Sequence, residues 1–188
     1  MPKRIVLAIT GASGALYAVD FLKIMAELAV EVDGLISAAG EKVLRIELGL
    51  AKADLKPVRR WYEAGDFTAP MASGSSRYHG MAVLPCTMGT LGAIAGGQSR
   101  NLLHRAADVM LKERRPLVLA VRETPLNGIH LKNMLAAHEA GAIICPAMPA
   151  FYHRPAEISD LARDFAMRVA SLLGIDHPDR RPWEGGDV

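Results

Sequence analysis

The chain has 188 residues but only two cysteines, Cys86 and Cys145, each at the end of an apolar run. Two thiols are too few for a disulfide framework, so we expect two buried, reduced cysteines in a reducing compartment. No segment approaches the roughly twenty apolar residues of a membrane span. The first apolar run breaks at Gly11 and lacks the layout of a signal peptide. We therefore expect a cytoplasmic protein without membrane contact.

The motifs of several common enzyme classes are also missing. The sequence contains neither G-x-G-x-x-G nor G-x-x-x-x-G-K-[ST], which argues against a nicotinamide dehydrogenase and a P-loop nucleotidase. A G-x-S-x-G nucleophile turn is absent as well. The six histidines are scattered without an H-E-x-x-H pair, so no metal site is predicted. A net charge of +2 provides no argument for nucleic-acid binding.

Apolar runs that alternate with helical patterns are what the chain does have. Residues 4–10 are continuously apolar from Ile5 to Ile9, which is typical of a strand covered on both faces. The alternation predicts a single-domain α/β fold, a doubly wound, mostly parallel sheet of the Rossmann-like or flavodoxin-like kind, with helices on both faces. The expected strands are 4–10, 30–37, 81–86, 116–121 and 142–145, and the expected helices are 13–28, 41–50, 90–95, 102–112, 127–140 and 155–173.

Two segments fall outside this alternation. Residues 51–78 are broken by prolines and a Ser-Gly cluster, so we expect a long connection, with Trp61 and Phe67 as its anchors to the core. Residues 176–188 are polar and rich in proline and glycine. We interpret residues 1–175 as the domain and 176–188 as a tail, whose Trp183 either anchors it or reaches a neighbouring subunit.

The turn after the first strand is the first candidate site. Gly11, Ala12, Ser13 and Gly14 lead directly from a strand into a helical pattern. Unpaired backbone N–H groups and the helix dipole then point the same way, which favours an anion. Taken alone, the same pattern also fits a tight turn without any ligand.

Other polar residues follow the remaining strands, and the carboxyl ends of parallel strands meet at one edge, where ligands bind. Turns rich in hydroxyl groups and glycine suit phosphate oxygens. Because the dinucleotide motif is missing, a mononucleotide such as FMN fits these turns better than a dinucleotide does. Arg122 and Glu123 alternate in direction if they continue a strand, so that each would face a different pocket; an exposed ion pair is the alternative. The residues in question are Ser37, Thr87, Met88, Gly89, Thr90, Arg122, Glu123 and Tyr152.

Arg105 and Lys112 are seven residues apart on one predicted helix, and this spacing places them on the same face. They are candidates for binding a phosphate. Periodicity alone, however, favours a solvated basic stripe that continues into residues 113–115.

Taken together, these motifs resemble the UbiX-like flavin prenyltransferases of the homo-oligomeric flavin-containing cysteine decarboxylase superfamily. The resemblance extends from Lys3 to about Trp183. It rests on GASGA at 11–15, ASGS at 72–75, CTMGTL at 86–91, NLLHRAADVMLKERRPLVL at 101–119, RETP at 122–125, IHLKNM at 129–134 and PAMPAFYHRP at 146–155.

The resemblance implies an enzyme that joins a dimethylallyl group from dimethylallyl phosphate to reduced FMN without a metal. Two bonds form, to the central-ring nitrogen and to the adjacent benzenoid carbon. The product, prenylated FMN, is the cofactor of UbiD-like decarboxylases. The resemblance also implies a dodecamer with active sites at subunit junctions, and a role in pathways such as ubiquinone biosynthesis.

The resemblance assigns site residues as well. Glu47 and Glu123 are the acidic residues beside the reacting centres, and Ser73 and Lys112 join them as catalytic groups. Thr87 stands where the family commonly has serine, a change that keeps the hydroxyl. The residues that the resemblance implies for FMN binding are Gly11, Ala12, Ser13, Ser37, Thr87, Met88, Gly89, Thr90 and Arg122. Those implied for binding the prenyl phosphate are Ser73, Arg105, Lys112, Tyr152 and Arg168.

Physical chemistry fits these roles. Cations and hydroxyls placed beforehand stabilise the charge that develops on a departing phosphate, and Glu123 is the candidate for removing the aromatic proton, with the released phosphate as an alternative base. Two other functions remain open: an FMN-dependent cysteine-type decarboxylase of the same superfamily, and a non-catalytic FMN carrier.

Overall fold

The computed structural model describes residues 3–180 and 185, and these form a single α/β domain around one sheet. Its six strands are all parallel and lie in the order β3-β2-β1-β4-β5-β6. The strands are β1 (Arg4–Ile9), β2 (Glu31–Ile36), β3 (Val58–Tyr62), β4 (Gly80–Cys86), β5 (Leu117–Val121) and β6 (Ile143–Ile144). The parallel, doubly wound sheet predicted from the sequence is confirmed.

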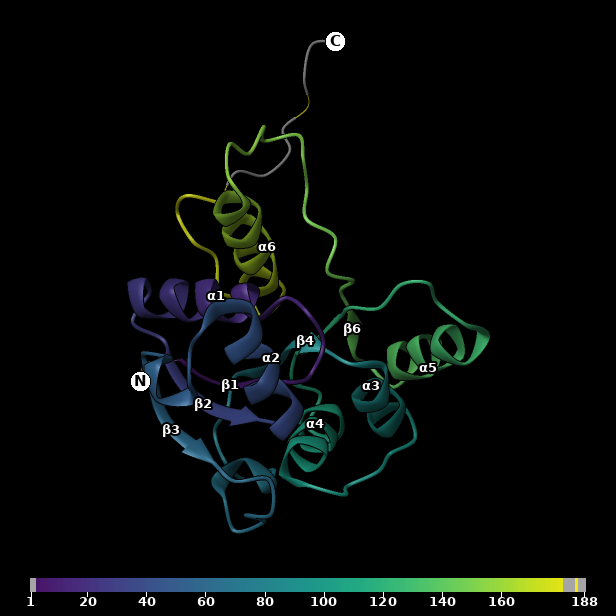
Figure 1. Cartoon of the computed structure of the whole chain (residues 1–188). Coiled ribbons are helices and arrows are strands. Elements are labelled where there is room, and N and C mark those ends of the chain that lie inside the picture. Colours follow the sequence, from purple (N-terminus) through teal and green to yellow (C-terminus); the bar gives the residue numbers. More distant parts are fainter. Residues whose placement is uncertain (1–2, 181–184, 186–188) are drawn as a thin grey trace.

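Helices cover both faces of this sheet (Figure 1). They are α1 (Ala15–Glu27), α2 (Ala38–Leu48), α3 (Met88–Ala95), α4 (Leu102–Lys112), α5 (Gly128–Glu139) and α6 (Ile158–Leu172), with short 3-10 turns η1 (Lys52–Asp54) and η2 (Pro70–Ala72). No helix in the described part of the chain is both long and apolar enough to cross a membrane.

The core has two halves, one on each side of the sheet. Ile5, Leu7 and Ile9 of β1 belong to the cluster formed with α1, α2 and α6, whereas Val6 and Ala8 belong to the cluster formed with α3, α4 and α5. This division follows from the alternation of side chains along a strand. Any residue of α4 is therefore separated from any residue of α6 by the thickness of the sheet, a fact that matters for the site.

The predicted long connection at 51–78 is wrong in one respect, because it contains strand β3 at the edge of the sheet. Arg59 and Arg60 of this strand are exposed, so it lacks the continuous apolar run that marks the inner strands. Trp61 packs against the core as expected, and a Cβ on Gly34 would lie 2.5 Å from its ring. Phe67 is not an anchor, since it is 48% exposed.

Helix ends differ from the prediction where side chains cap them. The last helix begins at Ile158 rather than near Pro155, because the Asp160 carboxylate accepts hydrogen bonds from the amides of Ala156 and Glu157. Similarly, α2 begins at Ala38, directly after its capping residue, and not at residue 41.

The two cysteines and the C-terminal segment agree only in part with the predictions. Cys86 is fully buried, but Cys145 is only half-buried. The division at residue 175 stays a prediction, although His177 beyond it is buried. Trp183 lies outside the described residues.

A buried carboxylate links the strands near their amino-terminal ends. Asp33 of β2 is 0% exposed and accepts hydrogen bonds from Arg4, Arg59 and Tyr78. Burial, together with the hydrogen bond to Asp33, raises the pKa of Tyr78 above its ordinary range. This network ties β1, β2, β3 and the segment before β4 together at the edge opposite the candidate site.

Candidate functional site

The loops that carry the predicted FMN residues gather at the carboxyl edge of the sheet. Gly11, Ala12 and Ser13 follow β1, Ser37 follows β2, the 87–90 turn follows β4, and Arg122 follows β5. Since β2, β1, β4 and β5 are neighbours in the sheet, these four loops lie side by side (Figure 1). Topology alone thus brings together segments from four different parts of the chain.

Thr10 joins two of these loops from beneath. Its side chain is buried, and its hydroxyl donates to the carbonyl of Pro85 at 2.7 Å and accepts from the amide of Thr87 at 2.9 Å. The ends of β1 and β4 are therefore fixed to each other. The sequence pattern counted Thr10 only as the last residue of a strand, because nothing in the spacing shows that its hydroxyl bridges to β4.

The loop after β2 also packs closely against the turn after β1. A Cβ on Gly11 would lie 2.5 Å from the Cβ of Ala39, so only glycine permits the turn after β1 to rest on the start of α2. Ser37 caps that helix by accepting from the amide of Gly40 at 3.0 Å.

The start of α3 presents hydrogen-bond donors to open space. Thr87 caps the helix by accepting from the amide of Thr90 at 3.2 Å, and it donates to the Thr90 hydroxyl at 3.0 Å. The amides of Met88 and Gly89, the first residues of α3, fall outside the hydrogen-bond ladder of the helix. Apart from its two chain neighbours and the backbone of α3 itself, no described atom lies within 4 Å of the point that a Cβ on Gly89 would occupy. The geometry suits an anion at this helix start.

The start of α1 already has an anion, and the chain itself provides it. The carboxylate of Glu47, which projects from α2, accepts from the amide of Gly14 at 3.0 Å and from the amide of Ala15 at 2.8 Å. The predicted affinity of this turn for negative charge is thus used by an internal carboxylate. The 87–90 turn and Ser37 provide the other donors at this edge.

Glu47 is held in its ionised form. Burial raises the pKa of its carboxyl, but hydrogen bonds from Ser13 and the amides of Ala15 and Gly14, together with the charge of Arg122, outweigh burial and leave the pKa below its ordinary value. Arg122 also acts on Tyr17 of α1: burial raises the pKa of that phenol, and Arg122 opposes the rise. Arg122 therefore lies within electrostatic reach of both.

Three cavities follow the segment 146–152 along this edge. One of about 190 Å³ lies between Ser13, Glu47 and Pro149. A second, of about 240 Å³, is lined by Arg122, Glu123 and several apolar side chains, and a third, of about 570 Å³, by Tyr152 and Arg168. Both predicted acidic residues and four of the predicted binding residues, Ser13, Arg122, Tyr152 and Arg168, therefore line cavities along this edge.

Arg122 and Glu123 do not face different pockets, as strand alternation predicts, but line the same cavity. The reason is that β5 ends at Val121, so both residues belong to the following turn, where alternation no longer applies.

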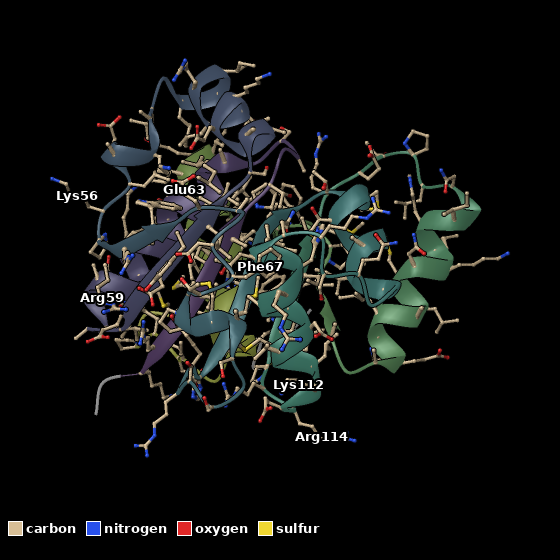
Figure 2. All side chains as sticks on the ribbon, turned by 90° about the horizontal axis from the view of Figure 1, so that it is seen from below. Lys56, Arg59, Glu63, Phe67, Lys112 and Arg114 are labelled. Atoms are coloured by element: carbon tan, nitrogen blue, oxygen red, sulfur yellow. The ribbon has the colours of Figure 1, made fainter. Side chains whose placement is uncertain are left out.

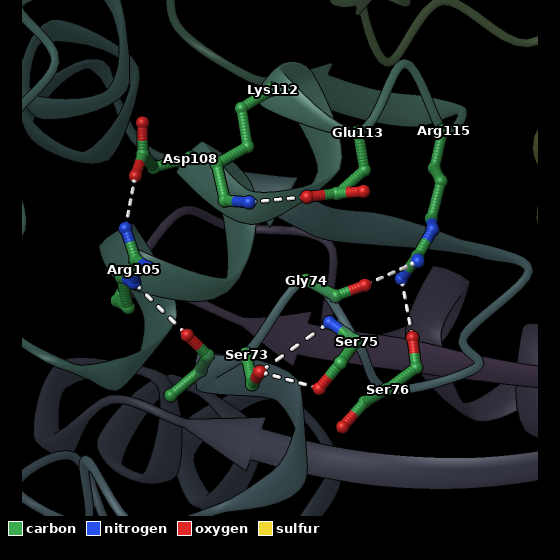
Figure 3. A network of polar contacts seen from close by, with 10 residues as sticks. Ser73, Gly74, Ser75, Ser76, Arg105, Asp108, Lys112, Glu113 and Arg115 are labelled. Atoms are coloured by element: carbon green, nitrogen blue, oxygen red, sulfur yellow. Dashed lines mark hydrogen bonds and ion pairs between the residues drawn. The ribbon is translucent and has the colours of Figure 1, made fainter.

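The remaining predicted residues form a second cluster, shown in Figure 3. Arg105 donates to the carbonyl of Ala72 at 3.0 Å and to the Asp108 carboxylate at 2.6 Å. Lys112 forms an ion pair with Glu113. The expected basic face of α4 thus exists, but its cations are partly neutralised by neighbouring carboxylates.

Arg115, which the sequence patterns did not single out, holds the loop of Ser73. Its guanidinium donates to the carbonyls of Ser76 at 2.6 Å and Gly74 at 2.7 Å. A Cβ on Gly74 would lie 2.6 Å from Lys112 Nζ, so this loop and the end of α4 are in close contact (Figure 3).

Within a single chain, the cluster of Ser73, Arg105 and Lys112 does not come together with the cavities at the carboxyl edge. Lys112 lies at the end of α4, directly before β5 and hence toward the amino edge of the sheet, on the face seen in Figure 2. Arg168 lies on α6, which belongs to the other face. The predicted prenyl-phosphate residues therefore divide into Ser73, Arg105 and Lys112 in one place and Tyr152 and Arg168 in another.

Among the described residues, no group of three or more His, Cys, Asp or Glu side chains is placed to hold a metal ion. The groups that line the site are backbone amides, hydroxyls, arginines and two carboxylates.

Comparison with known proteins shows the family to which the chain belongs. Residues 1–166 match the family model described as Flavoprotein. A protein of Methanothermobacter thermautotrophicus, "Flavin prenyltransferase UbiX", is 46% identical, and the match covers 99% of this chain and 98% of that protein. The chain belongs to the UbiX family of flavin prenyltransferases.

Two solved structures agree with this membership. The UbiX protein named AnUbiX (PadA1), in complex with FMN and dimethylallyl pyrophosphate, superposes with a TM-score of 0.96 at 41% identity over the full length of both chains. A dodecameric FMN-dependent UbiX-like decarboxylase from Escherichia coli O157:H7 superposes with a TM-score of 0.92 at 38% identity, covering 97% of this chain and all of the other. The UbiX family resemblance predicted from the sequence motifs is confirmed.

The contact between Glu47 and the start of α1 predicts a pH-dependent contribution to stability. Replacing Glu47 with glutamine removes the charge but keeps an acceptor, so we expect a loss of about 0.5 kcal/mol near pH 7. Because the pKa of Glu47 is lower in the folded state, its stabilisation is present above the ordinary value of 4.5 and is lost as the pH falls through the folded-state value.

The measurement is urea unfolding of both proteins at one protein concentration, between pH 3 and pH 8. Glu139→Gln, at the exposed end of α5, is the matched control and should show no comparable loss. A Glu47→Gln deficit that stays constant down to pH 3 would contradict the role of the charge.

Proposed function

We propose that this chain transfers a dimethylallyl group from a dimethylallyl phosphate ester to reduced FMN and releases prenylated FMN. The observation that carries the proposal is the carboxyl edge, where the donors at the start of α3 follow the strand next to β5, and where Arg122, Glu123, Tyr152 and Arg168 line two cavities. Membership of the UbiX family supports it.

The donor set fits the phosphate of FMN. The amides of Met88 and Gly89 and the hydroxyls of Thr87, Thr90 and Ser37 would hold the phosphate, because the amides at the start of α1 are already bound to Glu47. Thr87 keeps the hydroxyl that serine provides in the family, and that hydroxyl is already oriented by Thr90. The turn 11–13 and Arg122 would border the ring system.

The prenyl donor would bind by its phosphate to Tyr152 and Arg168 in the largest of the three cavities. When the carbon–oxygen bond of the ester breaks, negative charge grows on the leaving phosphate, and the fixed guanidinium stabilises that charge without reorganisation. The apolar lining beside Glu123, with Leu126, Met134 and Met148, would shield the allylic carbon from water.

Reduced FMN supplies two nucleophilic atoms: its central-ring nitrogen forms the first bond to the prenyl group, and the adjacent benzenoid carbon forms the second. The second bond would form when the double bond of the attached prenyl group takes up a proton and the benzenoid carbon attacks the resulting cation, after which this carbon loses its own proton. Glu123, on the turn after β5, is the candidate base for that proton, and Glu47 lies at the other end of the edge as an ionised carboxylate.

A second copy of the chain would complete the site. Ser73, Arg105 and Lys112 lie across the sheet from Arg168, so they can serve the same donor only at a junction between subunits. Exposed apolar side chains that such a junction would cover are present: Ile129 is 68% exposed, Met148 75% and Phe151 69%. The dodecamer of the Escherichia coli relative is the model for this assembly. A UbiD-like decarboxylase would receive the product.

Anaerobic incubation with reduced FMN and dimethylallyl phosphate tests the function. We expect the flavin released afterwards to be heavier by one C5H8 unit, as measured by mass spectrometry. An FMN carrier would return flavin of unchanged mass. A cysteine-type decarboxylase would also leave the flavin mass unchanged but would release carbon dioxide from a peptide with a C-terminal cysteine.

Replacing Glu123 with glutamine removes the proposed base while keeping the size of the side chain. We expect FMN binding to be retained and prenylation to stop after the first bond, with ring closure at least about a hundredfold slower. The open and closed adducts have the same mass and are separated by their absorbance spectra. Normal formation of the closed product would show that Glu123 is not the base.

Mixed oligomers test whether subunits share the site. Lys112→Ala and Arg168→Ala should each be nearly inactive, yet co-expression of the two variants should restore activity. If each site takes Lys112 from one subunit and Arg168 from another, random mixing leaves both residues intact in roughly a quarter of the sites.

The matched control is Lys112→Ala co-expressed with the Lys112→Ala/Arg168→Ala double variant, in which no site has Lys112. FMN retention by every variant confirms that the proteins are folded. Activity of the first mixture no higher than that of the control would contradict a shared site.

A further inference from the structure

The largest cavity at the carboxyl edge holds a second arginine that neither the sequence patterns nor the family resemblance assigned. Arg180, from the segment after α6, lines this cavity of about 570 Å³ together with Tyr152 and Arg168. Asp164 is the one carboxylate among the lining residues, and His153 lies 3.7 Å from it. Two guanidinium groups and a phenol around one cavity form a strongly anion-attracting set.

The segment that carries Arg180 is fixed to the body of the domain. His177 is 7% exposed, and its Nε2 lies 2.8 Å from a carboxylate oxygen of Glu27 on α1. Its Nδ1 accepts from the amide of Asp179 at 3.1 Å, and its carbonyl accepts from the amide of Arg180 at 3.0 Å. The short turn 177–180 is thereby closed around a buried ring, so Arg180 starts from a defined position.

Glu27 strengthens this anchor, because it binds α6 at the same time. The two terminal guanidinium nitrogens of Arg163, Nη1 and Nη2, donate to its carboxylate at 3.0 and 2.7 Å. α1, α6 and the turn 177–180 thus meet at one carboxylate, and the helix that carries Arg168 is fixed together with the turn that carries Arg180.

Among the described residues, the guanidinium of Arg180 is only weakly engaged. Its Nη1 lies 3.6 Å from Asp176, a carboxylate whose side chain is 71% exposed. Such an exposed pair contributes little and is readily exchanged for a better anion. A phosphate in the cavity would be a stronger partner, because charge-assisted bonds to guanidinium strengthen as water is excluded.

We propose that Arg180 binds the distal phosphate of a dimethylallyl diphosphate ester, while Tyr152 and Arg168 bind the phosphate next to the prenyl carbon. This inference rests on the proposed function and adds to it a residue that discriminates between the monophosphate and the diphosphate donor. A diphosphate carries a second phosphate and additional negative charge, and Arg180 is the additional cation that the cavity provides for it.

Calorimetric titration of the full-length, FMN-loaded protein with inorganic pyrophosphate and, separately, with inorganic phosphate tests the binding directly. We expect wild-type protein to bind pyrophosphate at least about tenfold more tightly than phosphate. Arg180→Gln should lose this difference while its affinity for phosphate changes less than about threefold, and Arg180→Lys should recover part of it. Equal affinity of wild-type protein for the two anions would overturn the proposal.

Steady-state kinetics with the two donor esters provide the second readout. We expect Arg180→Gln to lower kcat/KM for the diphosphate about tenfold to a hundredfold and to leave kcat/KM for the monophosphate within about threefold. The matched control is Arg154→Gln, since Arg154 lines the neighbouring cavity but not this one. Equal losses with both donors would mean that Arg180 acts on the shared phosphate or on the fold, and would also overturn the proposal.

The two hypotheses fail in different ways. If wild-type protein leaves the flavin mass unchanged with either ester, the proposed function is wrong, whereas the titrations still report whether Arg180 distinguishes the two anions. If the flavin is prenylated but Arg180→Gln does not alter the preference between donors, only the role of Arg180 is wrong.

Discussion

The parallel direction of all six strands is the constraint on which the rest of this molecule depends. It places the ends of β2, β1, β4 and β5 at one edge, so that a glycine turn, two helix starts and an arginine from four parts of the chain become neighbours. The same sheet is also a barrier, because α4 and α6 lie on opposite faces. One architectural fact therefore explains both what a single chain assembles and what it leaves apart.

Electrostatics at that edge is arranged by the chain before any ligand arrives. Glu47 satisfies the start of α1 and is itself held ionised, while Arg122 acts on Glu47 and Tyr17 from the end of β5. The start of α3 has no such carboxylate among the described residues, and the space beside Gly89 is open. Two helix starts that look equivalent in sequence thus have different partners, and only the geometry distinguishes them.

The sequence was sufficient for the inner sheet, because β1, β4 and β5 are buried on both faces and show as continuous apolar runs. It was insufficient for β3, whose exposed arginines hide its pairing with β2. The loops expected to bind FMN could be predicted, since each directly follows a strand. The bridging hydroxyl of Thr10, the clamp of Arg115 and the placement of Arg180 depend on contacts between distant segments, which no local pattern records.

The buried bridge from Thr10 to Pro85 and Thr87 has a consequence for the thermodynamics of binding. Two loops that are already joined by hydrogen bonds through a buried hydroxyl have little conformational entropy left to lose when a ligand settles on them. The cost of ordering is met when the chain folds rather than when the ligand binds. Affinity at this edge then reflects mainly the contacts that the ligand itself makes.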